Sequence, residues 1–407
     1  MPTRPGLLVA GDWPQFDLGE WLSLGSDGEG GPTLSQWLGP VDVHLDRAMV
    51  AGFEFRDVQA ALRFGDGRWR VGLRGPMAEG EVTIPEDLKG GKPIELQMQK
   101  LVLQSPPAAP GADAGEPLDP RNMPALNVRA DDFTWQARRF GAVQAVIAKV
   151  PQGLRFDTLT SKAPSYTVNA QGSWYMEGSA ARTRLGLELA STDLAATSVA
   201  LGYREAVEAK RASFKASVEW PGGPSGDALA RMDGKLHIAL DDGQLIDVKP
   251  GASGRMLGLL SVVELPRRLS LDFRDVTEKG LAFDKVRGDF ELKQGNAFTQ
   301  NLILKGAAVD IGLVGRTGLV TEDYDQTLVV SGNPSGPLTV AGAIAAGPVI
   351  GAGVLVLSQL FKGQLQGLTR AYYHVTGPWS NPVVERIAAP ANENAAGAPE
   401  PPAGGTP

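Results

Sequence analysis

The stretch FDKVRGDFELKQGNAFTQNLILKG, residues 283–306, decides the fold class of this chain. Apolar residues alternate with polar ones on both sides of the turn sequence KQG, with Phe290 before it and Leu302 and Leu304 after it. Such alternation puts every second side chain on the same face of a β-strand. A glycine-containing turn between two strands is typical of a hairpin. The stretch therefore predicts an antiparallel hairpin with one apolar face and one polar face.

The same arrangement occurs at least three times along the chain. FRDVQAALRFGDGRWRVGLRG begins at residue 55 and FGAVQAVIAKVPQGLRFDTLTS begins at residue 140. Each copy has Phe, two residues, Val, a strand, a glycine turn and a second strand, and another alternating strand follows each copy. We interpret these copies as one meander unit reused along a growing sheet. The alternative is that any β-meander shows such a pattern.

Composition supports a mainly β protein with many turns. Gly (51) and Pro (30) are both above average usage, while 43% hydrophobic and 21% charged residues are near globular values. We predict a long antiparallel, curled β-meander sheet that forms an open apolar groove, with a few short helices near the C-terminal end. Helices are expected at 191–203, with Ser191 or Thr192 as N-cap, at 252–264 and at 342–368.

Enzymatic chemistry is not indicated. The chain has three histidines, His44, His237 and His374, and no cysteine. His237 and His374 lie in alternating strand patterns, and no His or Cys pair has the spacing of a metal site. The net charge of −7 argues against a nucleic-acid partner. We therefore predict a protein that is not an enzyme, with no cofactor, no metal and no nucleic-acid partner.

The chain divides into five parts by composition. We predict a β-groove segment over 1–104, a Pro/Ala/Gly-rich loop or linker over 105–124, a second β-groove domain over 125–337, an apolar and amphipathic helical segment with a final strand over 338–388, and a disordered tail over 389–407. Because loop length costs little free energy, deleting 105–124 is expected to leave stability nearly unchanged. The first residues show no signal peptide, so the chain is expected to be cytosolic or part of a longer protein.

A long sheet with one apolar face must cover that face. It could close into a barrel, fold into a sandwich, or curl into a trough. A trough would leave an apolar surface that suits an apolar ligand, which is the sequence's own indication of lipid. The candidate lining residues are Leu271, Phe273, Phe283, Phe290, Leu302, Leu304, Val309, Ile311 and Leu313.

Residues 342–361 form an uncharged stretch long enough to span a membrane. Glycines and a proline weaken its first half as a helix, and its second half continues with an amphipathic pattern. We expect first a helix that lies in a membrane interface or caps the sheet, then a core helix, and last a membrane span. The residues on the apolar face of that helix are Leu357, Leu360, Phe361, Leu365 and Leu368.

Several blocks carry a resemblance to a known family. LPRRLSLDFRDV lies in the most specific block, residues 257–315, and further blocks are DWPQFDLGEWL, ALNVRADDFTWQARRFGAV, STDLAATSVALGY and YYHVTGPWSNPVVERI. In these blocks and their order, the chain resembles the C-terminal region of the YhdP proteins, which are AsmA-like. The resemblance extends through nearly the whole chain before the tail.

The resemblance implies a function in the Gram-negative cell envelope. It implies a periplasmic, membrane-associated C-terminal fragment of a protein that moves phospholipids between the inner and outer membranes through an apolar β-groove. The inner membrane would be reached through an N-terminal part that this chain lacks, and the outer membrane surface through the C-terminal end. The alternative from another class is a structural scaffold or regulator of envelope assembly with a dry β-core.

Overall fold

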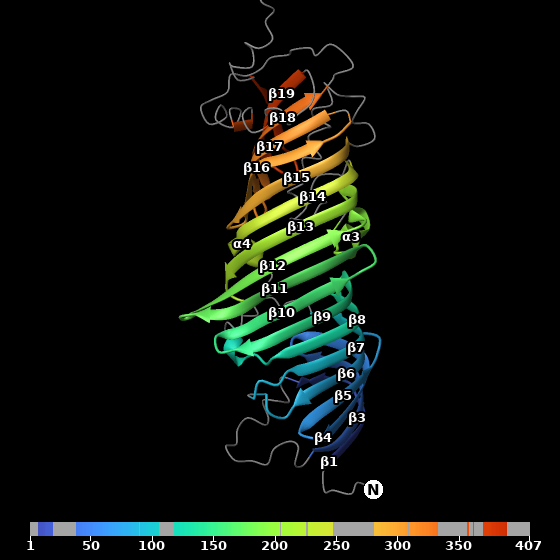
Figure 1. The fold of residues 1–407 in the computed structure, drawn as a ribbon. Coiled ribbons are helices and arrows are strands. Elements are labelled where there is room, and N and C mark those ends of the chain that lie inside the picture. Colours follow the sequence, from blue (N-terminus) through green and yellow to red (C-terminus); the bar gives the residue numbers. More distant parts are fainter. Residues whose placement is uncertain are drawn as a thin grey trace, which may run out of the picture. The chain divides into compact units, whose positions relative to one another are not determined.

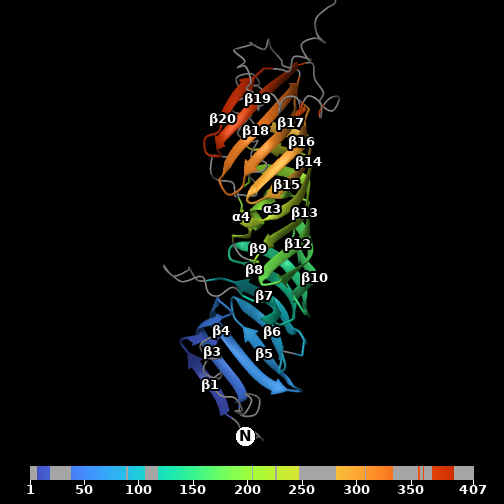
Figure 2. The ribbon, with the colours of Figure 1, turned by 90° about the vertical axis from the view of Figure 1, so that its left-hand side faces the viewer.

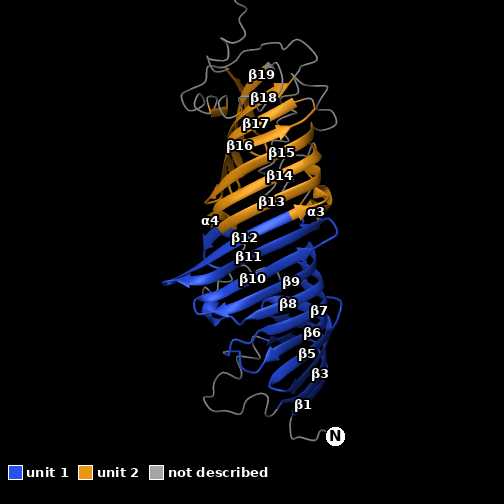
Figure 3. Ribbon diagram, viewed as in Figure 1, with its two compact units in different colours: residues 1–189, 200–202, 219–228 blue, residues 190–199, 203–218, 229–407 orange. Residues whose placement is uncertain are grey.

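The computed structural model describes residues 7–18, 38–88, 90–105, 118–203, 205–224, 227–246, 281–307, 309–332, 356–357, 361 and 369–388. These residues form 20 strands and only short helices, so the prediction of a mainly β protein is confirmed (Figure 1). The chain divides into two compact units (Figure 3). Unit 1 comprises residues 1–189, 200–202 and 219–228, and unit 2 comprises residues 190–199, 203–218 and 229–407.

Unit 1 is a meander whose strands mostly pair with their neighbours in sequence. Figure 2 shows β4, β5 and β6 of this unit side by side, and these strands are antiparallel neighbours. The strands that lie wholly or mostly in unit 1 are β1 (Leu7–Trp13), β2 (Phe16–Asp17), β3 (Leu38–Val50), β4 (Phe53–Gly65), β5 (Arg68–Arg74), β6 (Ala78–Pro85), β7 (Ile94–Leu103), β8 (Leu126–Trp135), β9 (Arg138–Val150), β10 (Gly153–Lys162), β11 (Tyr166–Glu177) and β12 (Ala180–Ser191).

Unit 2 continues the same design with antiparallel pairs from β14 to β20. Consecutive strands run in opposite directions, so each one begins at the end of the sheet where the strand before it finished. The strands that lie wholly or mostly in unit 2 are β13 (Val207–Pro221), β14 (Asp233–Leu245), β15 (Leu281–Lys293), β16 (Asn296–Lys305), β17 (Val309–Gly318), β18 (Asp323–Gly332), β19 (Thr369–Pro378) and β20 (Val383–Ile387).

Three strand pairs depart from the expected antiparallel pattern. β1 and β2 both pair with β3 in parallel, and β7 pairs with β8 in parallel. Parallel neighbours need a connection that returns along the whole strand. Since β7 has ten residues, residues 104–125 must return over roughly 33 Å.

This topology contradicts the expectation that residues 105–124 are dispensable. Their deletion would remove the return path between the parallel strands β7 and β8. The described end of this stretch also packs: the 3-10 helix η1 (Pro120–Asn122) lies against β10 and β11, and its Pro120 is buried. Composition alone did not reveal this role, because it says nothing of which strand ends a loop must join.

The repeated Phe-x-x-Val motif marks a change of face within a strand. Phe and Val stand three residues apart, so strict alternation would put them on opposite faces. In β4, however, Asp57 has a left-handed backbone (φ 52°), and both Phe55 and Val58 pack in one apolar cluster. In β9 the glycine of the motif, Gly141, has φ 68°. The extra residue therefore keeps both apolar side chains of the motif on one face.

Helices match the prediction in one place. Helix α3 (Leu194–Ala200) falls within the expected 191–203. Its N-cap is Asp193, whose Oδ1 accepts the Ala196 N–H at 3.0 Å, whereas Ser191 Oγ accepts the Asp193 N–H. Helix α4 (Ala228–Arg231) was not predicted, because four residues are too few to show helical periodicity.

The structure describes only a small part of the other segments that were predicted to be helical. Residues 252–264 and the tail 389–407 lie outside the described residues, and of 342–368 only 356, 357 and 361 are described. In the described part of the chain, none of the helices has the length and apolar character that crossing a membrane requires.

Gly315→Ala is expected to lower the stability of unit 2 by more than about 1 kcal/mol. Gly315 has φ 132°, and a Cβ at this position would collide with the backbone oxygen of Asp325 on the neighbouring strand. The shift of the urea midpoint measures the effect. Gly65→Ala is the control, because a Cβ at Gly65 meets nothing within 4 Å. Equal midpoints for both variants would contradict the prediction.

Asp323→Asn is expected to flatten the acid sensitivity of the fold. The Arg316 guanidinium lies 2.6 Å from Asp323 and lowers the pKa of that carboxyl below its ordinary 3.8. A lowered folded pKa gives stability that is complete above the unfolded pKa and is lost as the pH falls through the folded one. Urea midpoints at about pH 5 and pH 3 test this. The midpoint of the wild type should fall more than that of the variant, and an equal fall in both would contradict the prediction.

Candidate apolar binding face

One face of the unit 1 sheet is apolar along a row of directly paired residues from β3 to β11. Each residue of this central row is the cross-strand partner of the next, so the side chains follow one another along the sheet. The central row consists of Val41, Leu62, Val71, Val82, Leu96, Val128, Ala145, Leu159 and Ala170.

Two further rows widen this surface on either side. The first runs through Val43, Ala60, Leu73, Gly80, Met98, Ala130, Val143, Ser161 and Val168. The second contains Phe64, Trp69 and Ile84 on three strands and Ile94, Leu126, Ile147 and Phe156 on four. The hydroxyl of Ser161 donates to the Phe140 carbonyl at 2.6 Å, so it adds no free polar group. We call these three rows the apolar face of unit 1.

The reverse face of the same strands is polar. Residues next in sequence to those of the central row point to this reverse face, and they include Arg63, Arg70, Glu81, Gln97, Arg129 and Gln144. The sheet of unit 1 therefore separates a wet face from an apolar one, as the alternation predicted.

The apolar face of unit 1 is not sealed. Val71, Val82 and Leu96 in the central row are only half-buried. Exposed apolar surface of this extent is unfavourable in water and is typical of a surface that binds an apolar partner. Nine strands at about 4.8 Å spacing extend over roughly 38 Å, whereas one leaflet of a bilayer core is about 15 Å thick. The face is long enough to be a path for an acyl chain.

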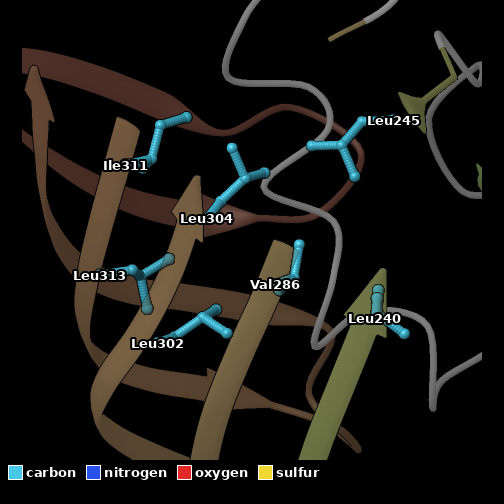
Figure 4. A pocket seen from close by; sticks show the side chains of 7 residues that line it. All are labelled: Leu240, Leu245, Val286, Leu302, Leu304, Ile311 and Leu313. Atoms are coloured by element: carbon cyan, nitrogen blue, oxygen red, sulfur yellow. The ribbon is translucent and has the colours of Figure 1, made fainter. Parts of the chain in front are cut away.

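Unit 2 has an apolar pocket on one face of strands β14 to β17. The pocket is partly open, and its empty space, with the adjoining open solvent included, is about 350 Å³. Figure 4 shows the side chains that line it along these strands. Val286, Leu304 and Ile311 are direct cross-strand partners, as are Leu302 and Leu313. The lining residues are Leu240, Leu245, Val286, Leu302, Leu304, Ile311 and Leu313.

Most of the predicted groove residues that the structure describes lie in or near this pocket. Leu302, Leu304, Ile311 and Leu313 line it. The remaining described candidates, Val309, Phe283 and Phe290, are buried but do not line the pocket. Leu271 and Phe273 lie outside the described residues.

Three pocket residues were not predicted from the sequence. Leu240 ends the alternating strand KLHIAL, and Val286 is the valine of the repeated motif, so both patterns contained a usable signal. Leu245 could not be assigned by alternation, since it is an odd number of residues from Leu240. Asp242, with a left-handed backbone (φ 50°), lies between them and changes the phase of the strand.

The pocket side chains are much more buried than the apolar face of unit 1. Leu240 is 0% exposed, Leu313 1% and Leu304 6%. The same local pattern of alternating apolar residues thus gives a half-exposed surface in unit 1 and a largely buried one in unit 2.

A second apolar cluster lies on the reverse face of β17 and extends over β18, β19 and β20. Val314, Val329, Tyr372 and Ile387 form it together with Leu357 and Phe361. A Cβ at Gly312 would lie 2.8 Å from the Phe361 ring, so this ring covers the strand between Ile311 and Leu313 on the side away from the pocket.

Of the five predicted interface residues, the structure thus brings two into a packed cluster. Leu357 is 0% exposed and Phe361 3%. Leu360, Leu365 and Leu368 lie outside the described residues. Contact of this segment with a membrane stays a prediction.

Charged residues are paired on the polar faces. His237 Nδ1 lies 2.7 Å from Asp289, and this hydrogen bond, with one from Asn301, lowers the pKa of the Asp289 carboxyl. The Arg287 guanidinium likewise lowers the pKa of Asp241. Among the residues that the structure describes, no group of three His, Cys, Asp or Glu side chains could hold a metal ion. The chemistry that these surfaces offer is the binding of apolar chains.

Comparison with known proteins agrees with this chemistry. Over 272 residues the chain is 26% identical to the intermembrane phospholipid transporter YhdP of Escherichia coli (strain K12), and the match covers 67% of this chain and 22% of that protein. No solved structure matches the chain. Residues 1–384 match the family model described as YhdP protein, and the chain therefore belongs to the YhdP family.

Proposed function

We propose that this chain is part of a periplasm-spanning protein that moves phospholipids between the inner and outer membranes. Its apolar face carries the acyl chains from one strand to the next along the rows. The inner membrane is reached through a part of the protein that this chain does not include, and the outer membrane through the C-terminal end. The chain is periplasmic and membrane-associated in this proposal, and its role is transport rather than catalysis.

The observation that carries the proposal is the half-exposed central row of unit 1. Every position in this row is apolar and aliphatic, from Val41 to Ala170. An acyl chain that slides from one strand to the next exchanges one aliphatic contact for a similar one, so the barrier to movement is low. A ligand of this kind also removes the exposed apolar surface from water. The Escherichia coli relative is named an intermembrane phospholipid transporter, which supports the same conclusion.

Photo-crosslinking in the full-length protein tests the proposal. A photoreactive amino acid is placed at Val71 on the apolar face or at Arg70, the adjacent residue on the polar face. Crosslinked phospholipid, identified by mass spectrometry, should appear with Val71 and not with Arg70. Equal yields at the two positions, or none at Val71, would refute the proposed path.

A second candidate function is a non-transporting scaffold of the cell envelope. The observation in its favour is the burial of the unit 2 pocket, where Leu240 and Leu313 are nearly inaccessible. A photoreactive group at Leu304 distinguishes the two functions. Lipid adducts at Leu304 support transport through unit 2, whereas adducts only to protein at both Leu304 and Val71 support the scaffold.

A further inference from the structure

Two charged side chains of β9 lie on the same side of the sheet as the apolar face of unit 1. Arg138 begins this strand and Lys149 lies near its end, with apolar side chains between them on the same face: Phe140, Val143, Ala145 and Ile147.

Strand pairing sets the face of each cation. Arg138 is the direct partner of Trp135, which is in turn the direct partner of Leu103. Leu103 packs against the buried cluster of Ala78, Met98, Leu101 and Ala130, which belongs to the apolar face. Lys149 is the direct partner of Leu154, one step along the face from the pair Ile147 and Phe156.

The sign of these charges is informative. The chain has 46 acidic and 39 basic residues, yet in the described strands β3 to β11 no carboxylate lies in register with the apolar rows. Carboxylates such as Glu79, Glu81 and Asp157 belong to the reverse face or to bulges. Positive charge beside an apolar surface is complementary to an amphiphile with a negative head.

The surroundings of Arg138 change from polar to apolar from the strand end inward. At the edge, the exposed Arg138 lies beside Trp135, whose side chain is 45% exposed. One step inward, the rings of Phe133 and Phe140 are 5.7 Å apart, and aliphatic rows follow. Tryptophan favours the boundary between polar headgroups and hydrocarbon, and the arginine fork matches a phosphate better than any other cationic side chain does.

We propose that Arg138, with Trp135 beside it, binds the phosphodiester headgroup of a phospholipid whose acyl chains lie on the apolar face. This inference rests on the proposed function and adds a site to it. The stem of Arg138 lies close to Gly202, since a Cβ at Gly202 would lie 3.4 Å from the Arg138 Cγ. The site would hold the lipid headgroup near the end of the strand where β9 begins, and the acyl chains would extend from there onto the apolar rows.

Arg138→Gln in the full-length protein tests the site, with Arg139→Gln as matched control. Arg139 is adjacent and has the same charge, but it pairs with Thr134 on the reverse face. The probes are a fluorescent phosphatidylglycerol and an uncharged diacylglycerol with the same chains and label. Arg138→Gln should weaken phosphatidylglycerol binding about tenfold and leave diacylglycerol binding unchanged. Arg139→Gln should change neither.

The outcomes separate this inference from the proposed function. If both variants bind phosphatidylglycerol like wild type, the headgroup site is wrong while lipid binding stands. If wild type binds neither probe, the proposed function itself fails. Inorganic phosphate at millimolar concentration should not displace phosphatidylglycerol. If it displaces the lipid from wild type but not from Arg138→Gln, the site serves free phosphate and the inference is overturned.

Trp135→Leu provides an independent check. This change keeps an apolar side chain at the edge but removes the indole, so phosphatidylglycerol affinity should fall by less than in Arg138→Gln. The wild-type affinity should also decrease with salt, and Arg138→Gln should reduce that dependence, because screening acts on the ionic contact alone. A salt dependence that is the same in wild type and Arg138→Gln would contradict the ionic contact.

Discussion

Val71→Asp is expected to abolish phospholipid transfer by the full-length protein while unit 1 remains folded. Val71 lies in the central row between Leu62 and Val82, and it is half-buried. A carboxylate there still reaches water, so the fold tolerates it. A passing acyl chain would have to desolvate the charge, which costs several kcal/mol and stops movement along the row.

The measurement pairs lipid transfer between vesicles with the far-UV circular dichroism of the same preparation. Gly72→Asp is the control, since it introduces the same side chain at the next residue, on the polar face. Its Cβ has room, the nearest atom being the Ala61 oxygen at 4.0 Å. Normal transfer by folded Val71→Asp would place the path elsewhere, and unfolding of Val71→Asp would show that this face is a closed core.

Leu304→Asp is expected to unfold unit 2. Leu304 is 6% exposed and lies between Val286 and Ile311 in a pocket lined by aliphatic side chains only. No described group there can pair with a carboxylate. Burial of an unpaired charge costs several kcal/mol. That is a large part of the total free energy of unfolding of a typical domain, which is about 5–15 kcal/mol.

Limited proteolysis and urea unfolding measure this effect. Gln300→Asp is the control, because Gln300 is an exposed residue of the same strand. If Leu304→Asp remained folded but lost transfer, unit 2 would have an open groove like the face proposed for unit 1. If it remained folded with full transfer, Leu304 would lie outside the lipid path.

The strands and their apolar residues could be predicted from the sequence alone. Alternation is a local property: a period of two puts Leu302 and Leu304 on one side of a strand whatever the rest of the chain does. Alternation also put Ile311 and Leu313 on one side of the next strand. The structure then pairs Leu302 with Leu313 and Leu304 with Ile311. The candidate site in unit 2 was therefore largely visible in the sequence.

Other parts of the site depended on distant segments. The parallel pairing of β7 with β8 brings Leu96 beside Val128 across a long connection, and no local signal specifies it. The row Leu103, Trp135 and Arg138 exists only because of that pairing and of the hairpin that follows it. Leu245 joined the pocket because Asp242 changes the phase of its strand, which alternation cannot show.

The sequence by itself determined a mainly β chain, the two faces of its strands and the apolar character of one of them. The tertiary structure decided which of these apolar residues stay accessible. Val71 and Leu304 both lie on the apolar face of an alternating strand, yet Val71 is half-buried and Leu304 almost fully buried. Alternation depends on the geometry of one strand, whereas burial is the sum of contacts with segments far away in the chain, and only the folded molecule brings those segments together.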